Sequence, residues 1–140
     1  MNTGQTRYTH VAGTLTLRQA VCDKYQRDNQ LSYQPNQVLV SNGAKQSIYN
    51  LTVAILEAGD EVIIPAPYWV SYDAMVAMTG AGSIILPCPA SQAFKLTAAQ
   101  LSAAITAKTK LLMLNSPSNP SGQTYSRAEL PLSLIPILHV

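Results

Sequence analysis

The stretch of sequence that decides the fold covers residues 111–122 and reads LLMLNSPSNPSG. Its four apolar residues predict a buried strand, and the prolines, asparagines and glycine that follow predict a rigid loop at the strand's carboxyl end. Open α/β sheets bind their ligands at that end. Asn119 lies between Ser118 and Pro120, which restricts its backbone, and a side-chain amide held in this way can donate a hydrogen bond to a fixed oxygen. We therefore interpret this loop as functional rather than as a structural turn.

Segments with the patterns of helices and strands alternate on the amino-terminal side of this loop. Helices are predicted at residues 14–28, 44–57, 68–79 and after a capping box formed by Thr97 and Gln100. Strands are predicted at residues 38–40, 61–64, 83–86 and 110–114. This order predicts an α/β fold, a three-layer sandwich in which helices cover both faces of a mostly parallel sheet.

The pattern changes near the carboxyl end. Ser126 and Glu129 form a second capping box and predict a helix, but Pro131 and Pro136 follow, and a proline inside a helix costs about 3 kcal/mol. Residues 131–140 are apolar and contain no Asp, Glu, Lys or Arg. We expect residues 6–130 to form the folded domain and residues 131–140 to be an aberrant tail, as a shifted reading frame would produce.

A second candidate site begins at Ser41, where a predicted strand ends and Gly43 turns the chain into a helix. The free N–H groups at the start of a helix form an anion site, and a bound phosphate would remove the conflict between Lys45 and the helix dipole. Taken alone, this motif fits a lysine that points into water better than a phosphate site, because turns that lead into helices are common.

Trp69, the only tryptophan, follows Pro65-Ala66-Pro67 at the end of another predicted strand. An indole there can stack on a flat aromatic cofactor, although a tryptophan alone is more often part of a core or an interface. Three strand ends thus offer an anion cradle, an aromatic plate and an amide donor. Their convergence predicts one binding site.

Composition excludes several function classes. The net charge of +2 gives no basic patch for nucleic acid, and no uncharged apolar stretch reaches the roughly 18 residues that cross a membrane. Cys22 and Cys88 are widely spaced and, like His10 and His139, show no metal-binding pattern. We expect buried thiols in a reducing compartment, the cytoplasm. The charged fraction of 11%, against about a quarter in typical domains, predicts a surface that contacts other protein or an incomplete chain.

Residues 6–130 resemble the aspartate aminotransferases, the bacterial subgroup of class I aminotransferases with pyridoxal phosphate (PLP) fold type I. The likeness is carried by residues 42–46 (NGAKQ), 59–62 (GDEV), 67–72 (PYWVSY) and 115–122 (NSPSNPSG), together with Tyr8, Gly13, Leu17 and Arg18. The resemblance implies part of the large, PLP-binding domain. It also implies cis peptide bonds at Ala66-Pro67 and Asn119-Pro120.

The resemblance further implies roles for individual residues. The residues that the resemblance implies for cofactor binding are Gly43, Ala44, Lys45, Trp69, Asn119 and Tyr8. The backbone at Ala44 and Lys45 would hold the phosphate, and Tyr8 would reach the phosphate of a neighbouring subunit in a homodimer. Trp69 would stack on the pyridine ring and touch the substrate. Asn119 would bond the phenolic oxygen of the ring and the substrate carboxylate.

The resemblance implies transamination between an amino acid, aspartate first, and a 2-oxo acid such as 2-oxoglutarate. None of the lysines Lys24, Lys45, Lys95, Lys108 and Lys110 lies where the family places its Schiff-base lysine. The aspartate for the pyridine nitrogen and the arginines for phosphate and carboxylates are also missing. No catalytic residue is therefore present, and we expect a fragment that is inactive alone.

Other interpretations remain open at this point. A non-catalytic interaction module would pair with another chain through an open sheet edge. An unrelated nucleotide-binding domain is weakened by the missing Gly-x-Gly-x-x-Gly and phosphate-loop motifs. Aromatic or prephenate-type substrates also stay possible, because the arginine that reads the substrate side chain is absent.

Overall fold

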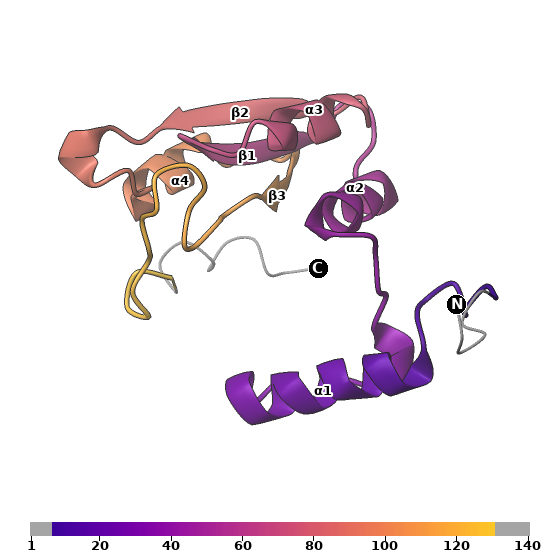
Figure 1. The fold of residues 1–140 in the computed structure, drawn as a ribbon. Helices are drawn as coiled ribbons and strands as arrows, with labels where there is room; N and C mark the ends of the chain where they lie inside the picture. Colours follow the sequence, from indigo (N-terminus) through magenta and orange to yellow (C-terminus); the bar gives the residue numbers. More distant parts are fainter. Residues whose placement is uncertain (1–6, 131–140) are drawn as a thin grey trace. The chain divides into compact units, whose positions relative to one another are not determined.

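A computed structural model describes residues 7–130 of the chain (Figure 1). The chain forms two compact units, Met1–Ser47 and Ile48–Val140. The elements are, in chain order, α1 (Leu15–Asn29), η1 (Pro35–Gln37), α2 (Ala44–Ile55), β1 (Glu61–Ala66), α3 (Ser71–Ala77), β2 (Gly82–Pro87), η2 (Ala90–Gln92), α4 (Ala98–Ala104) and β3 (Thr109–Leu112). The predicted tail at residues 131–140 lies outside the described residues, and the proposed domain limits of 6–130 stay a prediction.

The sheet lies in the second unit and is parallel throughout its described strands. β1 is central, with β2 on one side and β3 on the other. Glu61 of β1 pairs with Gly82 of β2 and with Thr109 of β3, and the register with β3 shifts by one residue between Glu61 and Val62. Both pairings are parallel, so the predicted α/β fold with a parallel sheet is confirmed. The carboxyl ends of the three strands therefore meet at one edge of the sheet.

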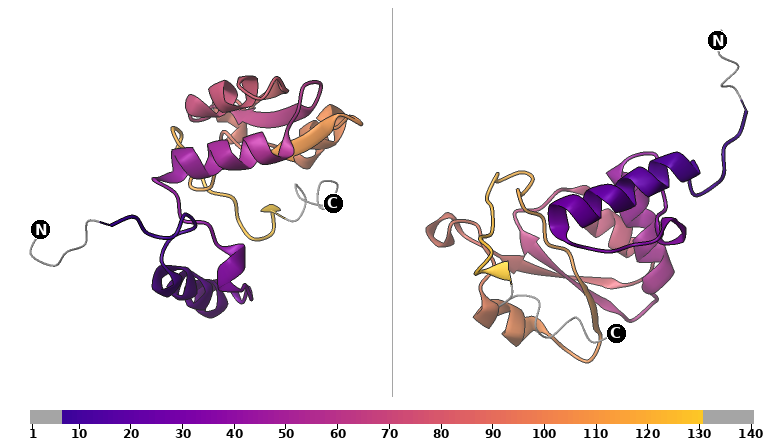
Figure 2. Two further views of the ribbon diagram at one scale, coloured as in Figure 1. Left: turned by 90° about the vertical axis from the view of Figure 1, so that its right-hand side faces the viewer. Right: turned by 90° about the horizontal axis from the view of Figure 1, so that it is seen from below.

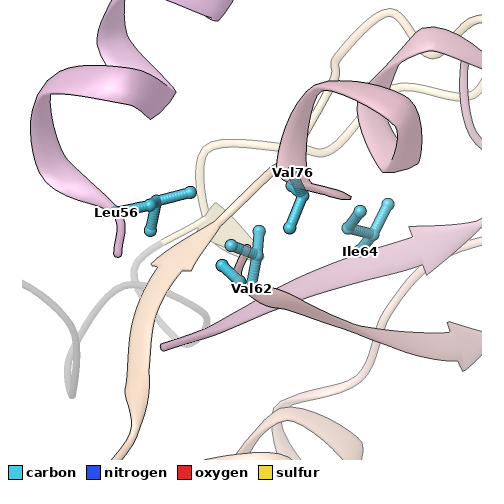
Figure 3. Packing of buried hydrophobic residues seen from close by; sticks show 5 residues of the cluster. Leu56, Val62, Ile64 and Val76 are labelled. Atoms are coloured by element: carbon cyan, nitrogen blue, oxygen red, sulfur yellow. The ribbon is translucent and has the colours of Figure 1, made fainter. Parts of the chain in front are cut away.

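One face of β1 packs against the residues that precede it and against α3. Val62 and Ile64 form a core cluster there with Leu56, Val76 and Ala81 (Figure 3). Val62, Ile64 and Val76 are fully buried. Alternate side chains of a strand point to opposite faces of its sheet, so these two β1 residues cover a single face.

The other face of β1 is covered by α4. Ile63, fully buried, packs there with Cys88, Leu96 and Leu101. A strand buried on both faces reads as a continuous apolar run rather than as an alternating one, which is the pattern at residues 62–64. The second unit therefore has three layers, as the sequence predicts.

Capping residues set the starts of the helices. The Thr14 hydroxyl accepts a hydrogen bond from the Leu17 N–H (3.4 Å), and α1 then runs unbroken for 15 residues (Figure 2). The predicted box at Thr97 and Gln100 is present, with reciprocal bonds of 3.2 and 3.1 Å. The box at Ser126 and Glu129 also forms its two bonds.

The strand predicted at residues 38–40 is wrong. Leu39 is 57% exposed, and the Val40 N–H donates to the Ala12 carbonyl (3.0 Å) rather than to a sheet. An apolar segment forms a β-strand only where a neighbouring strand can pair with it. The strands of the described sheet all belong to the second unit, whereas residues 38–40 belong to the first. Gly13 meets Val40 so closely that a Cβ would lie 2.7 Å from the Val40 Cγ2, so only glycine fits there, at φ +94°.

Several element limits also differ from the predictions. The helix expected at residues 68–79 spans only Ser71–Ala77, and β3 ends at Leu112. Among residues 7–130, no helix is long and apolar enough to cross a membrane. In the same part of the chain, no group of three or more His, Cys, Asp or Glu side chains is arranged to hold a metal ion.

Candidate functional site

The first candidate site is the turn at residues 41–45, called here the glycine turn, in the first unit. Gly43 has φ +88°, and its carbonyl accepts the first bond of α2, from the Ser47 N–H (3.3 Å). The Gln46 side chain accepts the Asn42 N–H (2.6 Å). The first N–H groups of a helix have no acceptors inside it, so those of α2 point out of its amino-terminal end.

The donor set of the glycine turn suits an anion. The first turn of α2 has no acidic side chain, and it carries Lys45. Gly43, Ala44 and Lys45 are all exposed, and a Cβ on Gly43 would meet no atom of the described residues within 4 Å. A phosphate therefore fits this end of α2 in charge, donors and access. Tyr8, also in the first unit, is fully exposed.

The second candidate site is the loop at residues 115–122, called here the asparagine loop, in the second unit. The Asn115 Oδ1 accepts the Asn119 N–H (2.9 Å), and the Gly122 N–H donates to the Ser118 carbonyl (2.8 Å). The Ser118 N–H donates to the Gln123 carbonyl (2.8 Å). These bonds close the loop on itself and present Asn119 at its exposed tip.

Three X–Pro bonds near this loop are cis. Two of them, Ala66-Pro67 and Asn119-Pro120, confirm the predictions. The third, Ser116-Pro117, was not predicted.

Asn119 borders a small hollow of about 20 Å³, which has room for about one water molecule. The lining comes from the end of β1, from α3 and from the asparagine loop, and it includes Pro67, Tyr72 and Asn115. Trp69 does not line the hollow but packs edge-to-face on Tyr72, with ring centroids 5.5 Å apart and an interplanar angle of 89°. Burial raises the pKa of Tyr72.

The predicted site residues therefore fall into two groups. Within the second unit, Trp69 packs on Tyr72, and Tyr72 and Asn119 line the same hollow. The other four, Gly43, Ala44, Lys45 and Tyr8, belong to the first unit. The hollow beside Tyr72 and Asn119 has room for about one water molecule, and Asn119 at its border is exposed.

Two residues of this region were missed by the sequence analysis. Tyr72 lies in the predicted helix at residues 68–79 and in the motif at residues 67–72, but the sequence analysis gives it no role at the site. Its position three residues after Trp69 is the signal for their aromatic pairing. Tyr125 also lines the hollow, and its hydroxyl accepts the Leu96 N–H (2.7 Å). Burial is the main cause that raises the pKa of Tyr125, while the bond from Leu96 lowers it. A partner 29 residues away leaves no local signal in the sequence.

Comparison with known proteins agrees with the resemblance. A family model described as aminotransferase class I and II matches residues 1–131. An aspartate/prephenate aminotransferase of Cereibacter sphaeroides is 52% identical over 130 residues, which cover 93% of this chain and 32% of that protein. An aspartate aminotransferase of a Bacillus species is 49% identical, over 93% of this chain and 33% of its own.

Solved structures show the same relation. The aspartate aminotransferase of Rhizobium meliloti superposes with a TM-score of 0.91 at 46% identity, over 96% of this chain and 34% of its own. That of Thermus thermophilus, solved with maleate, gives 0.92 at 39% identity, over 96% and 35%. The chain spans about a third of the length of the curated relatives it matches. By the match over residues 1–131, the chain belongs to the class I and II aminotransferase family.

Proposed function

We propose that this chain carries part of the PLP site of an aminotransferase that moves the amino group of aspartate to a 2-oxo acid such as 2-oxoglutarate. The observation that carries the proposal is the asparagine loop, whose internal bonds hold Asn119 beside the hollow that Tyr72 shares. The names of relatives at 49–52% identity support aspartate as the amino donor, and one of them adds prephenate.

The glycine turn is the proposed phosphate site. The first N–H groups of α2, at Ala44 and Lys45, would donate to the phosphate oxygens, and the positive end of the helix dipole favours their charge. Gly43 holds the turn that exposes these groups, at a φ that few other residues adopt. In the full dimer, Tyr8 would contribute its hydroxyl to the phosphate of the other subunit.

Asn119 and Trp69 are proposed to hold the ring and the substrate. The Asn119 amide would donate to the phenolic oxygen of the ring and to the substrate carboxylate, and Trp69 would cover the ring plane. Tyr72 fixes the orientation of Trp69 through its edge-to-face contact. When bound, PLP supplies an electron sink for the bonding changes at the substrate's α-carbon.

We assign no lysine among residues 7–130 to moving the proton at that α-carbon. Lys95 is bound to Glu129 (3.0 Å) and Lys24 to Asp28 (3.0 Å). Lys45 lies in the glycine turn of the first unit, and Lys108 and Lys110 lie beside and on β3, away from the carboxyl edge of the sheet. We therefore propose that the chain alone does not transaminate, and that the active protein is a homodimer with further residues. Its two buried free thiols, Cys22 and Cys88, suit the cytoplasm.

Trp69 provides the test, because it is the only fluorescent indole of the chain. Pyridoxamine phosphate is the probe, since it has no aldehyde to react with surface lysines, and pyridoxamine is the control without phosphate. We expect the phosphate compound to quench Trp69 and to bind at least about tenfold more tightly than pyridoxamine, a difference of about 1.4 kcal/mol. Equal affinity for the two compounds, or no quenching by either, would contradict the proposal.

Activity gives an independent measurement. The chain with PLP, aspartate and 2-oxoglutarate should form no oxaloacetate above the rate of PLP alone. Turnover above that background would overturn the proposed need for further residues.

A further inference from the structure

We propose that Tyr125 is a positioning residue, which fixes the asparagine loop so that Asn119 meets the ring oxygen in one orientation. This inference rests on the proposed function of Asn119. It assigns to Tyr125 no contact with substrate or cofactor.

Tyr125 ties two separate parts of the second unit together. Its backbone N–H donates to the Ser116 hydroxyl (3.0 Å), near the start of the asparagine loop. Its own hydroxyl accepts the Leu96 N–H (2.7 Å), just before α4. Leu96 is buried in the core cluster with Ile63 and Leu101. The loop is therefore connected through one side chain to the rigid interior.

The Leu96 end of this connection is itself held firmly. Ala93 and Phe94 both have left-handed backbone conformations, at φ +52° and +55°, which residues other than glycine adopt rarely. The Phe94 N–H donates to the Pro89 carbonyl (3.1 Å), and the Gln92 amide donates to the Lys95 carbonyl (2.6 Å). The Leu96 N–H, which donates to the Tyr125 hydroxyl, therefore has little freedom to move.

The chain that follows Tyr125 is fixed as well. Glu129 accepts the Ser126 N–H (2.6 Å) and bonds Lys95 Nζ (3.0 Å), and this ammonium also lies 6.0 Å from the centre of the Tyr125 ring. The ring lines the same 20 Å³ hollow as Asn119. Tyr125 is therefore held from both sides, and its hydroxyl is placed to transmit that order to the loop.

The hydroxyl is the part of Tyr125 to which we assign the positioning role. Tyr125→Phe keeps the ring in the hollow but leaves the part-buried Leu96 N–H without this acceptor. Ser116→Ala removes the tie at the loop end and leaves Tyr125 intact. The matched control is Tyr33→Phe, a tyrosine of the first unit whose ring packs on Tyr25.

The first measurement is amide hydrogen exchange at Ser118, Asn119 and Gly122, whose N–H groups bond within the loop or to Gln123. We expect exchange to rise about three- to tenfold in Tyr125→Phe and in Ser116→Ala, the equivalent of one hydrogen bond. Exchange at Val62 and Ile64 should stay unchanged in both, and Tyr33→Phe should resemble the wild type. Unchanged loop exchange in both variants would overturn the proposal.

The second measurement separates a role that acts through Asn119 from a merely structural one. Affinity for pyridoxamine phosphate is compared in Asn119→Ala, Tyr125→Phe and the double variant. We expect each single change to weaken binding about three- to tenfold, and the double variant to bind no more weakly than Asn119→Ala. Losses that multiply would overturn the positioning role. If the wild type does not bind the probe, the proposed function fails, and the exchange measurement still decides whether Tyr125 orders the loop.

Discussion

The glycine turn and the asparagine loop both connect a segment to the next element, but different bonds hold them in shape. The glycine turn depends on a backbone conformation, φ +88° at Gly43, and on the start of α2. The asparagine loop has two backbone bonds of its own and depends in addition on side chains: Asn115 accepts the Asn119 N–H, and Ser116 accepts the Tyr125 N–H. The two candidate sites are therefore sensitive to different substitutions.

The difference follows from what each part would present to a ligand. An anion at the glycine turn would meet backbone N–H groups, whose directions the helix already fixes. A ring oxygen at Asn119 would meet a side-chain amide, whose direction depends on the loop that carries it. A side-chain donor therefore needs further side chains to hold its loop, and a backbone donor does not.

The largest effect is expected from a substitution in the core that supports the asparagine loop. Ile63→Ala leaves a cavity between β1 and α4, and the Ile63 carbonyl accepts the Met113 N–H (3.0 Å) where β3 leads into the loop. Large-to-small changes at fully buried sites cost about 2–5 kcal/mol. Urea unfolding should show this loss, with faster exchange at Met113.

The control for that substitution is Ile55→Ala, an exposed isoleucine at the end of α2. It should cost less than about 1 kcal/mol, as surface changes do. Equal losses for the two isoleucines would mean that the core cluster on the α4 side does not support the unit.

The second effect tests the glycine turn against a matched glycine. Gly43 and Gly59 have φ +88° and +99°, and a Cβ on either would meet no described atom within 4 Å. Alanine at either position should therefore cost about 1–2 kcal/mol from backbone conformation alone. Thermal unfolding measures this cost.

Binding then separates the two glycines. Only Gly43→Ala should weaken the affinity for pyridoxamine phosphate, because only Gly43 shapes the proposed phosphate site. If both variants bind the probe as the wild type does, the glycine turn is not the phosphate site.

The parts of this molecule that sequence predicts are those fixed by neighbours in the chain. Thr97 and Gln100 lie three residues apart and form their box as expected. The strand predicted at residues 61–64 is also present, and the structure shows that residues 62–64 of its apolar run are buried on both faces.

The rest depends on partners distant in sequence. Residues 38–40 have the composition of a strand, but the Val40 N–H donates its hydrogen bond to the Ala12 carbonyl and not to a neighbouring strand. Likewise, nothing near Tyr125 in the sequence indicates Leu96 as its partner. The asparagine loop was found because its composition is unusual, whereas the side chain that ties it to the core was not.

The third effect compares single side-chain acceptors in the two parts. Asn115→Ala removes the acceptor of the Asn119 N–H, and Gln46→Ala removes that of the Asn42 N–H. We expect Asn115→Ala to cost about 1 kcal/mol, because one hydrogen bond is lost with no compensation. Gln46→Ala should cost only a few tenths, since alanine favours the helix that begins there.

Amide exchange at Asn119 and Asn42 measures the two effects locally, and urea unfolding measures them globally. Similar local losses in both variants would contradict the distinction between a loop held by side chains and a turn held by the backbone.

The smallest effect concerns the segment that follows the asparagine loop. Glu129 has its pKa lowered from 4.5 to about 2, first by the Ser126 N–H, then by the Ser126 hydroxyl and Lys95. Because the pKa of Glu129 is lower in the folded state than in the unfolded state, its ionised carboxylate stabilises the fold at pH values above the unfolded-state pKa. This contribution is lost as the pH falls from about 4.5 toward 2. Glu129→Gln keeps an acceptor for Ser126 but no charge, so its stability should change less than that of the wild type over this window.

Titration of the Glu129 carboxyl carbon by NMR checks the pKa directly. Lys95→Met should raise that pKa only part of the way to 4.5, because both bonds from Ser126 precede the lysine among the causes. If Lys95→Met restored the ordinary value completely, the ion pair rather than the capping turn would hold this carboxylate. The segment after Tyr125 would then be ordered by a surface charge pair and would loosen with added salt, whereas a turn closed by backbone and hydroxyl bonds keeps its shape in salt.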